Sequence, residues 1–462
     1  MTDFASLLIA DRGQPAHDLI PLLAGNFDSW LAKQSAQVRA LASAARFQAK
    51  LGERLILPAK KEHEWSVIFG AAADPGPWDL AGLVARLPEG HYRLADGAPG
   101  AATLGWLLTH HRFDRYLGKP DPIPQRVLLT SEPARIDDQV ALAEAVALVR
   151  DLVDTPAADM GPAELAQAAE TVAKRHGARF KVTAGDALSQ GYPMIAAVGR
   201  AATRERAPRL IEIEWGDPTD PRIAVVGKGV CFDSGGLDIK PASAMLAMKK
   251  DMGGAAHALA LASLVMRARL PVRLHLLIPA VENAISADAF RPGDILSSRK
   301  GISVEIGNTD AEGRLVLGDA LTRAAEDKPA MIIDFATLTG AARVALGPDL
   351  PAMFSNDDAL AAELAAAARA ACDPLWRMPL WSDYADMLKS TVADINNAGE
   401  GGMAGATTAA LFLQRFVPDG LPWVHLDTFA WRPSPKPGRP KGGEALGLRA
   451  IYALLSGRFG AA

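Results

Sequence analysis

The chain has 462 residues, which is too long for one ordinary hydrophobic core and therefore predicts at least two domains. Its composition, with 49% hydrophobic and 22% charged residues, excludes a disordered protein. The net charge of -4 gives no general attraction to nucleic acid or anionic membranes, and no apolar run approaches the ~20 residues that cross a bilayer.

The N-terminal part of the chain, residues 1–134, predicts a small α/β domain. Short apolar runs in this region are typical of buried strands, and segments between them have a helical spacing. The strands are expected at residues 66–70 and 126–129, and the helices at residues 80–87 and 103–109. We find no group of residues here that would carry out chemistry.

A longer helix is predicted next. Residues 137–154 have apolar side chains at helical spacing, and the pattern stops at Pro156. The residue before a proline is pushed out of the helical conformation, so the helix is expected to end there. We therefore expect a connecting helix within residues 135–158 and a second, larger domain over residues 159–462.

Within the larger domain, strand and helix patterns alternate, which favours an α/β fold with a mixed, mostly parallel sheet flanked by helices. The strands are expected at residues 210–215, 223–226, 272–280, 331–335 and 424–427, and the helices at residues 257–268, 318–326, 359–371 and 407–416. In such folds, ligands bind outside the carboxyl ends of the strands. The unusual polar motifs of this chain fall at those places.

Three segments combine carboxylates, lysines and glycines: residues 227–236 (GKGVCFDSGG) followed by Lys240, residues 248–254 (MKKDMGG), and residues 308–315 (NTDAEGRL). Asp310 and Glu312 are two residues apart, so in an extended chain both would point to the same side. The segments contribute four carboxylates, Asp233, Asp251, Asp310 and Glu312. Grouped in one cleft, these charges would repel one another unless cations neutralise them, so divalent metal ions are expected.

The ligand types narrow the choice of metal and reaction. Carboxylate oxygens suit Mg, Mn or Zn, and a lysine amine beside them favours the Zn, Mn or Co end of the series. Two metal ions that share carboxylates activate a water molecule and polarise a carbonyl group, which predicts a hydrolase. A phosphatase is one alternative, but it would have no reason for a lysine-ligated metal.

These segments resemble those of the leucyl (cytosol) aminopeptidases, and NTDAEGRL is close to a signature for that family. Further matches in the same order are DTPA from Asp154, DFATLTGA from Asp334 and AGATTAALFL from Ala404. The resemblance covers residues 148–452 and fades in the N-terminal region. It implies a metal-dependent aminopeptidase that removes the N-terminal residue from peptides.

The resemblance also implies roles for individual residues. Two divalent ions, Zn or Mn, would be held by Lys228, Asp233, Asp251, Asp310 and Glu312. Lys240 would polarise the scissile carbonyl, and Arg314 would hold a bicarbonate ion as general base for the metal-activated water. The substrate would lie along Met248, Asn308, Ala311, Gly313, Thr337, Leu338 and Gly340, and Met248 would wall the pocket for the first side chain.

The same resemblance implies a homohexamer that acts on short peptides with a free N-terminus. A cytoplasmic location is expected because Cys231 and Cys372 give no disulfide framework, and Asp3 stands where a signal peptide carries basic charge. Some relatives bind DNA or are inactive scaffolds. The acidic net charge argues against nucleic acid, and the survival of all seven metal-binding and catalytic residues argues against a scaffold.

The segment after Asp427 and the residue Cys231 are two further features of the larger domain. After His425-Leu426-Asp427 the chain is shorter than in many relatives, and Phe429 or Arg432 would narrow or recharge the pocket for the first side chain, so a preference for leucine does not follow. Cys231 is interpreted as a buried packing residue, because a cysteine nucleophile needs a histidine partner and no local signature supplies one.

Overall fold

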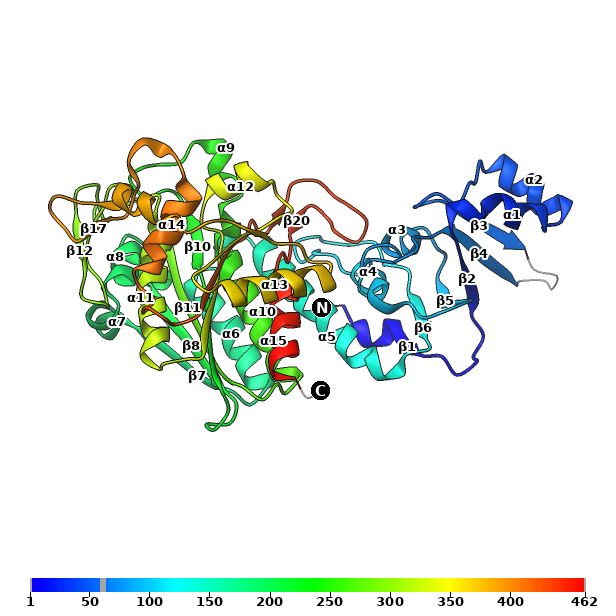
Figure 1. Ribbon diagram of the computed structural model, residues 1–462, viewed down its shortest axis with the longest axis horizontal. Helices are drawn as coiled ribbons and strands as arrows, with labels where there is room; N and C mark the ends of the chain where they lie inside the picture. Colours follow the sequence, from blue (N-terminus) through cyan, green and yellow to red (C-terminus); the bar gives the residue numbers. More distant parts are fainter. Residues whose placement is uncertain (1, 59–63, 461–462) are drawn as a thin grey trace. The chain divides into compact units, whose positions relative to one another are not determined.

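The computed structural model describes residues 2–58 and 64–460, and the chain divides into two compact units (Figure 1). The first unit contains Met1–Ala147 together with Ser434–Lys441, and the second contains Leu148–Pro433 and Gly442–Ala462. Helix α5 (Ile136–Asp154) carries the chain from the first unit into the second and confirms the helix predicted at residues 137–154. The predicted domain limits at residues 134 and 158 stay a prediction.

The first unit is built on a sheet that has six strands among the described residues, and only β3 is antiparallel to its neighbour. In sheet order the strands are β1 (Leu8–Ala10), β6 (Arg126–Thr130), β5 (Gly90–Leu94), β2 (His17–Leu22), β4 (Trp65–Gly70) and β3 (Arg54–Pro58). Its α-helices are α1 (Phe27–Ala32), α2 (Ala36–Ala44), α3 (Ala81–Val84) and α4 (Thr103–Leu108). The two strands and two helices predicted here are confirmed, although α3 is a single turn.

The segment Ser434–Lys441 returns to this first unit from a distant part of the sequence. Pro437 packs at Gly82, where an added Cβ would lie 3.7 Å from the proline ring. The guanidinium carbon of Arg439 lies 4.6 Å from the centre of the Trp78 ring, within cation–π distance. The first unit is therefore packed from two segments that are far apart in the sequence.

The second unit contains a larger mixed sheet, which confirms the predicted fold class. Strands β9, β11, β14 and β18 are parallel to their central neighbours, whereas β7, β8 and β15 introduce antiparallel pairs. In sheet order the strands are β16 (Trp376–Arg377), β15 (Ala352–Ser355), β18 (Trp423–Asp427), β14 (Met331–Ala336), β9 (Arg222–Gly227), β11 (Arg273–Asn283), β8 (Arg209–Trp215) and β7 (Arg179–Ala184), and β10 (Gly229–Asp233) pairs with β11.

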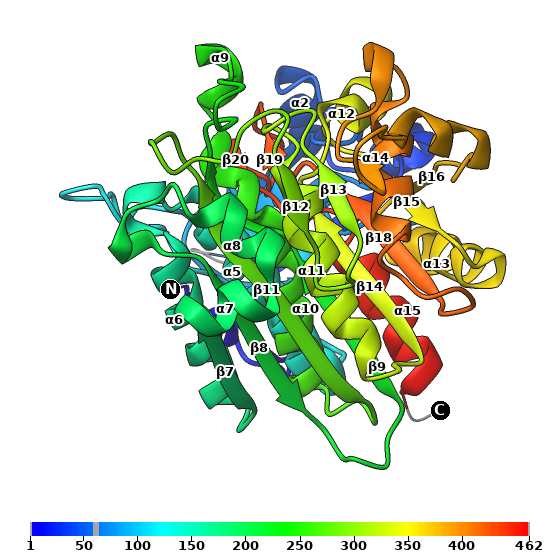
Figure 2. The ribbon, with the colours of Figure 1, turned by 90° about the vertical axis from the view of Figure 1, so that its left-hand side faces the viewer.

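Helices cover both faces of this sheet (Figures 1 and 2). One face carries α7 (Gly185–Gly191), α8 (Pro193–Gly199), α11 (Glu312–Glu326) and α14 (Gly405–Gln414), and the other carries α6 (Pro162–Arg175), α10 (Gly253–Arg267), α13 (Asp358–Ala370) and α15 (Leu448–Phe459). The central strands are buried on both faces, which explains why they appear in the sequence as continuous apolar runs.

Smaller elements lie around the larger sheet. A short sheet contains β12 (Ile295–Ser297), β13 (Ser303–Glu305) and β17 (Ile395–Asn396), and a two-stranded ribbon joins β19 (Trp431–Arg432) to β20 (Gly442–Gly443). Two short helices, α9 (Ala242–Met245) and α12 (Gly340–Leu346), follow β10 and β14. Within the described ranges, every helix is too short or too polar to cross a membrane.

Candidate functional site

The three polar motifs meet beyond the carboxyl ends of the central strands. Lys228 directly follows β9, Asp233 is the last residue of β10, and Thr337 directly follows β14. Asp251 is in the turn that leads into α10, and Glu312 is the first residue of α11. Parallel strands end at the same edge of a sheet, so segments far apart in sequence reach one place.

The conformation of the third motif differs from the expected extended chain. Asp310 is in a turn, where its N–H donates to Asn308 Oδ1 at 2.7 Å, and Glu312 begins helix α11. The expectation that alternation along an extended chain aligns these two carboxylates is therefore wrong. The turn and the start of the helix align them instead, and carboxylate oxygens of Asp233, Asp310 and Glu312 lie within 4.8 Å of one another.

Lys228 lies at the centre of the cluster. Its Nζ is 2.6 Å from Asp251 Oδ2 and 2.9 Å from Glu312 Oε1, and the side chain is almost completely buried. Burial alone would lower the pKa of Lys228, but the charges of Asp251 and Glu312 outweigh it and raise the pKa above the usual lysine value. Binding through this amine therefore requires a cation strong enough to displace a proton.

Lys240 pairs with the other end of the cluster. Its Nζ lies 2.7 Å from Asp233 Oδ2 and also forms an ion pair with Asp310. Burial alone would lower the pKa of Lys240, but the negative charges of Asp233 and Glu312 outweigh it and raise this pKa above the usual lysine value. The five groups Lys228, Lys240, Asp233, Asp310 and Glu312 thus alternate in charge across the site.

The nearby lysines do not fully neutralise the negative charge of the carboxylates. Burial and the charge of Asp233 raise the pKa of Glu312 to about 8, and the same two causes raise that of Asp310 to about 6. The buried Glu312 Oε2 has no hydrogen-bond partner among the described residues. A buried oxygen without a donor, within a cluster of carboxylates and an amine, fits the ligand set of divalent transition-metal ions.

Two glycines permit this close arrangement. A Cβ on Gly313 would lie 2.6 Å from Lys228 Cε, so any larger residue would displace the lysine side chain. Gly235 has φ of +89°, a conformation that other residues rarely adopt, and turns the chain after Asp233. A larger residue at Gly313 or Gly235 would therefore disturb the arrangement of the site.

The cluster forms part of the wall of a cavity of about 410 Å³. All of the residues predicted from sequence to act on metal or substrate line this cavity except Gly313, which packs behind Lys228. They are Lys228, Asp233, Lys240, Met248, Asp251, Asn308, Asp310, Ala311, Glu312, Arg314, Thr337, Leu338 and Gly340. The predicted site residues therefore converge on one cavity.

Two polar residues hold the expected metal-ligand residues in place: Asn283, which the sequence analysis did not identify, and Thr337, which it assigned to the peptide cleft. Asn283, the last residue of β11, donates from Nδ2 to Asp233 Oδ1 at 2.9 Å and to the Thr309 carbonyl at 3.1 Å. The Thr337 hydroxyl donates to Asp251 Oδ1 at 2.7 Å. The location of Asn283 at a strand end was the only available signal, because it lies far in sequence from its partners.

Asp427 holds the loop between β14 and α12. Its Oδ1 accepts hydrogen bonds from the N–H groups of Leu338 and Thr339 at 3.0 and 3.2 Å, and its Oδ2 accepts one from the Thr339 hydroxyl at 2.6 Å. His425 instead packs in the core, where its Nδ1 lies 2.6 Å from Asp334 Oδ1. Of the His425–Asp427 segment, only the aspartate lines the cavity.

Part of the Arg314 guanidinium group can still donate a hydrogen bond to a ligand. Its Nη1 donates to the Asn397 carbonyl at 2.6 Å, while its buried Nε has no hydrogen-bond partner in the described part of the chain. Burial lowers the pKa of Arg314 to about 10, although the neighbouring charge of Glu312 acts in the opposite direction. A small anion would satisfy the remaining donor and the buried charge together.

The region after Asp427 differs in part from expectation. Phe429 lines the cavity, but Arg432 does not. Arg432 is buried, with Nε 3.2 Å from Glu444 Oε2 and Nη1 3.0 Å from Asp349 Oδ1. The alternative that Arg432 recharges the pocket is therefore wrong, because carboxylates already neutralise it. Cys231 is fully buried, and burial raises the pKa of its thiol, as expected for a packing residue.

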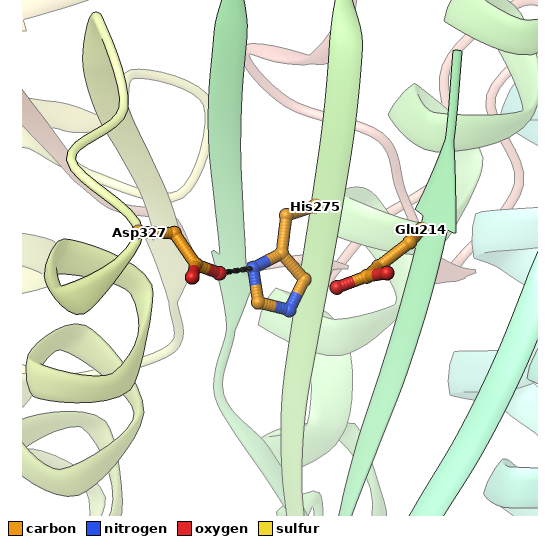
Figure 3. Close-up of side chains that lie close together, drawn as sticks. All are labelled: Glu214, His275 and Asp327. Carbon is orange, nitrogen blue, oxygen red and sulfur yellow. Dashed lines mark ion pairs between the residues drawn. The ribbon is translucent and has the colours of Figure 1, made fainter. Parts of the chain in front are cut away.

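A second group of possible metal ligands lies elsewhere in the larger unit. His275 on β11 is between Glu214 and Asp327, and its Nδ1 is 3.3 Å from Asp327 Oδ2 (Figure 3). Arginines already pair with both carboxylates: Arg323 Nη1 lies 2.9 Å from Asp327 Oδ2, and Arg179 Nη1 lies 3.6 Å from Glu214 Oε2. This group is an ion-pair network whose negative charge is already balanced.

Comparison with known proteins agrees with the geometry of the cavity. Residues 147–452 match the model of the cytosol aminopeptidase family, catalytic domain, and residues 18–128 match that of the M17 aminopeptidase, N-terminal domain. The chain is 43% identical over 368 residues to a probable cytosol aminopeptidase from Syntrophotalea carbinolica, covering 76% of this chain and 73% of that protein. It is also 43% identical over 372 residues to a probable cytosol aminopeptidase from Roseiflexus castenholzii, covering 77% of this chain and 75% of that protein.

Solved structures show the same likeness. The crystal structure of cytosol aminopeptidase from Coxiella burnetii has a TM-score of 0.93 and 44% identity, with 98% of this chain and 99% of that one covered. The structure of the bottromycin maturation enzyme BotP in complex with Mn has a TM-score of 0.86 and 32% identity, with 98% of this chain and 99% of that one covered. The chain therefore belongs to the cytosol aminopeptidase family and is a metal-dependent aminopeptidase.

Proposed function

We propose that the protein removes the N-terminal residue from short peptides by means of two divalent metal ions bound in the cavity. The observation that carries this proposal is the buried cluster of Asp233, Asp310 and Glu312, whose oxygens lie within 4.8 Å of one another beside the amine of Lys228. Such a group is costly to bury without cations, and the unpartnered Glu312 Oε2 has room for a further interaction.

The ligands of the two ions would be Lys228, Asp233, Asp251, Asp310 and Glu312, with Zn²⁺ or Mn²⁺ as the ions. When bound, the ions supply an activated water molecule and polarise the scissile carbonyl. The Mn reported with BotP, a relative in structure, supports manganese as one of the candidates. By the family resemblance, the free amine of the substrate binds at the Lys228–Asp251 end of the cluster, which explains the need for an unblocked N-terminus.

The protein's own residues orient the reaction. Lys240, held by Asp233 and Asp310, presents an ammonium group to the cavity and would stabilise the negative charge that develops on the scissile carbonyl oxygen. Arg314, with its free Nε–H, would hold a bicarbonate ion that accepts the proton of the attacking water. The loop Thr337–Gly340, fixed by Asp427, would bind the peptide backbone and so position the reacting carbon.

The test is hydrolysis of leucine p-nitroanilide by protein reconstituted with Mn²⁺ or Zn²⁺. The free-amine substrate should be hydrolysed and its N-acetyl derivative should not. Asp310→Asn keeps the size of the side chain but removes a ligand charge, so we expect kcat/KM to fall at least about a thousandfold. Asp419→Asn, at an exposed aspartate in the same unit, is the matched control and should keep full activity.

Two results would contradict the proposal. Hydrolysis of the N-acetyl derivative would show that the free amine is not bound as described. Full activity of Asp310→Asn, with metal content unchanged by elemental analysis, would exclude the carboxylate cluster as the metal site.

We also propose that the enzyme is cytoplasmic and forms a homohexamer that restricts access to short peptides. Support comes from family membership and from the name cytosol aminopeptidase that the relatives carry.

A further inference from the structure

Two further basic side chains line the cavity beside the proposed metal-ligand cluster. We propose that Arg343 and Lys250 form a subsite that binds a carboxylate group of the peptide substrate, next to the ring of Phe429. This inference rests on the aminopeptidase function proposed above. It assigns a chemical class of substrate to two basic residues that have no part in the cleavage step.

Arg343 supplies the permanent charge of this subsite. It is exposed, lies in the last turn of α12 and lines the same cavity as the metal-ligand cluster. Its guanidinium carbon is 4.9 Å from the centre of the Phe429 ring, and it has no ion-pair partner in the described part of the chain. Because a guanidinium stays protonated and has a fork of N–H donors, it is suited to bind a carboxylate through two hydrogen bonds.

Lys250 approaches the same ring from another element. It is in the short 3-10 helix η7 (Met248–Met252), is buried, and has its Nζ 5.5 Å from the Phe429 ring centre. Its nearest carboxylate oxygen, Asp251 Oδ1, is 3.5 Å away and already accepts a hydrogen bond from Thr337 at 2.7 Å. The Lys250 amine, which lines the cavity, therefore has N–H groups that can donate to a ligand there.

The position of Lys250 relates this subsite to the substrate. Met248, two residues earlier in the same short helix, also lines the cavity, and the family resemblance assigns it to the pocket for the first side chain. A carboxylate that reaches Arg343 and Lys250 could come from the side chain of an acidic first residue or from the C-terminus of a dipeptide. Both sources present the same anion to the same two basic side chains.

The experiment compares pairs of substrates that differ only in one charge. Glutamate and glutamine p-nitroanilides test the side-chain source, and leucyl-leucine and leucyl-leucinamide test the C-terminal source. The wild-type enzyme should favour the charged member of at least one pair. Arg343→Met should lower that ratio of kcat/KM values by about tenfold, as expected for loss of a hydrogen bond to a charged group.

Control variants test whether the effect of Arg343→Met comes from the loss of its positive charge or from a change in structure. Arg369→Met removes an exposed arginine from the last turn of another helix, α13, and should leave both ratios unchanged. Arg343→Lys keeps a cation and should retain part of the preference. Raising the salt concentration should reduce the preference of the wild-type enzyme, because salt screens exposed charges.

The outcomes distinguish failure of the subsite from failure of the proposed function. If leucine p-nitroanilide is hydrolysed but Arg343→Met has the same two ratios as the wild type, the subsite is wrong and the aminopeptidase function stands. If the metal-reconstituted wild type hydrolyses none of the substrates, the proposed function fails and the subsite fails with it.

Discussion

At the scale of single residues, the site is organised by opposite charges that share a small buried volume. Lys228 is within 2.9 Å of both Asp251 and Glu312, and Lys240 forms ion pairs with Asp233 and Asp310. Removing one member would leave its partner buried without compensation, which is far more costly than losing a surface pair. Substitutions here should therefore affect both metal binding and the folded state.

The raised pKa of Glu312 predicts a dependence of stability on pH in the metal-free protein. Its pKa is about 8 when folded, because of burial and Asp233, against an ordinary value of 4.5. The unfolded chain thus loses the proton first, and this residue increasingly lowers the free energy of unfolding as pH rises from 4.5 to 8. Glu312→Gln cannot ionise, so its melting temperature relative to the wild type should rise between pH 5 and pH 8.

Thermal unfolding in the presence of a chelator measures this difference. A constant gap between the two melting temperatures across the pH range would mean that Glu312 does not take up a proton at neutral pH in the folded protein. Saturation with metal should reduce the pH dependence of the wild type, because bound cations replace the proton.

At the scale of elements, the cavity depends on loops that are held by residues from neighbouring strands. Asp427 at the end of β18 accepts two backbone hydrogen bonds and one hydroxyl hydrogen bond from the loop that follows β14. Asn283 at the end of β11 donates hydrogen bonds that join the last residue of β10 to the segment before α11. Each loop is thus fixed by a strand that is distant in sequence.

Asp427→Asn should loosen the loop Thr337–Gly340, which we propose binds the substrate, without unfolding the protein. The amide keeps one oxygen but cannot accept the hydrogen bond of the Thr339 hydroxyl as well as those of the two N–H groups. We expect KM for leucine p-nitroanilide to rise and kcat/KM to fall by about tenfold. Asp357→Asn is the control, because Asp357 caps helix α13, where asparagine is an equally good cap, and activity should not change.

A KM that stays at the wild-type value in Asp427→Asn would show that the loop does not position the substrate. Thermal unfolding of the two variants would show whether any loss of activity reflects a general loss of stability.

The elements of the larger unit could be predicted from sequence where burial alone decides their structure. Strand β14 is buried along its whole length and appears as an unbroken apolar run. Helix α11 begins at Glu312, before the predicted start at residue 318, because its first turn carries ligand and glycine residues in place of a regular apolar stripe. Strand β7 was missed because its side chains are mostly exposed and its pattern is largely polar.

The site followed the same division. The carboxylates and lysines were identified by their unusual combination in sequence, and the peptide-binding positions by the family resemblance. All of these predicted site residues except Gly313 line the cavity. Lys250 and Arg343 were not identified, because a lysine beside a ligand and an arginine on a short helix look like solvated surface charges in sequence. Only the arrangement of η7 (Met248–Met252) and α12 in space shows that both residues line the same cavity.

At the scale of the whole molecule, assembly can be measured directly. If the proposed homohexamer is correct, light scattering coupled to size-exclusion chromatography should give about six times the chain mass of 48.8 kDa. The particle should persist on dilution to assay concentration, because obligate assemblies bury large apolar interfaces. A mass equal to one chain in a preparation with full activity would rule out the hexamer as the working form.

The return of Ser434–Lys441 to the first unit has a consequence for biosynthesis. Residues 1–147 are translated before the larger unit, yet Pro437 and Arg439, which pack at Gly82 and Trp78, are translated only after residues 148–433. That patch stays uncovered while the larger unit is being made, which favours transient capture by a chaperone. Cutting the gene at codon 147 would separate this patch from its cover, so the two units are not independent modules for recombination.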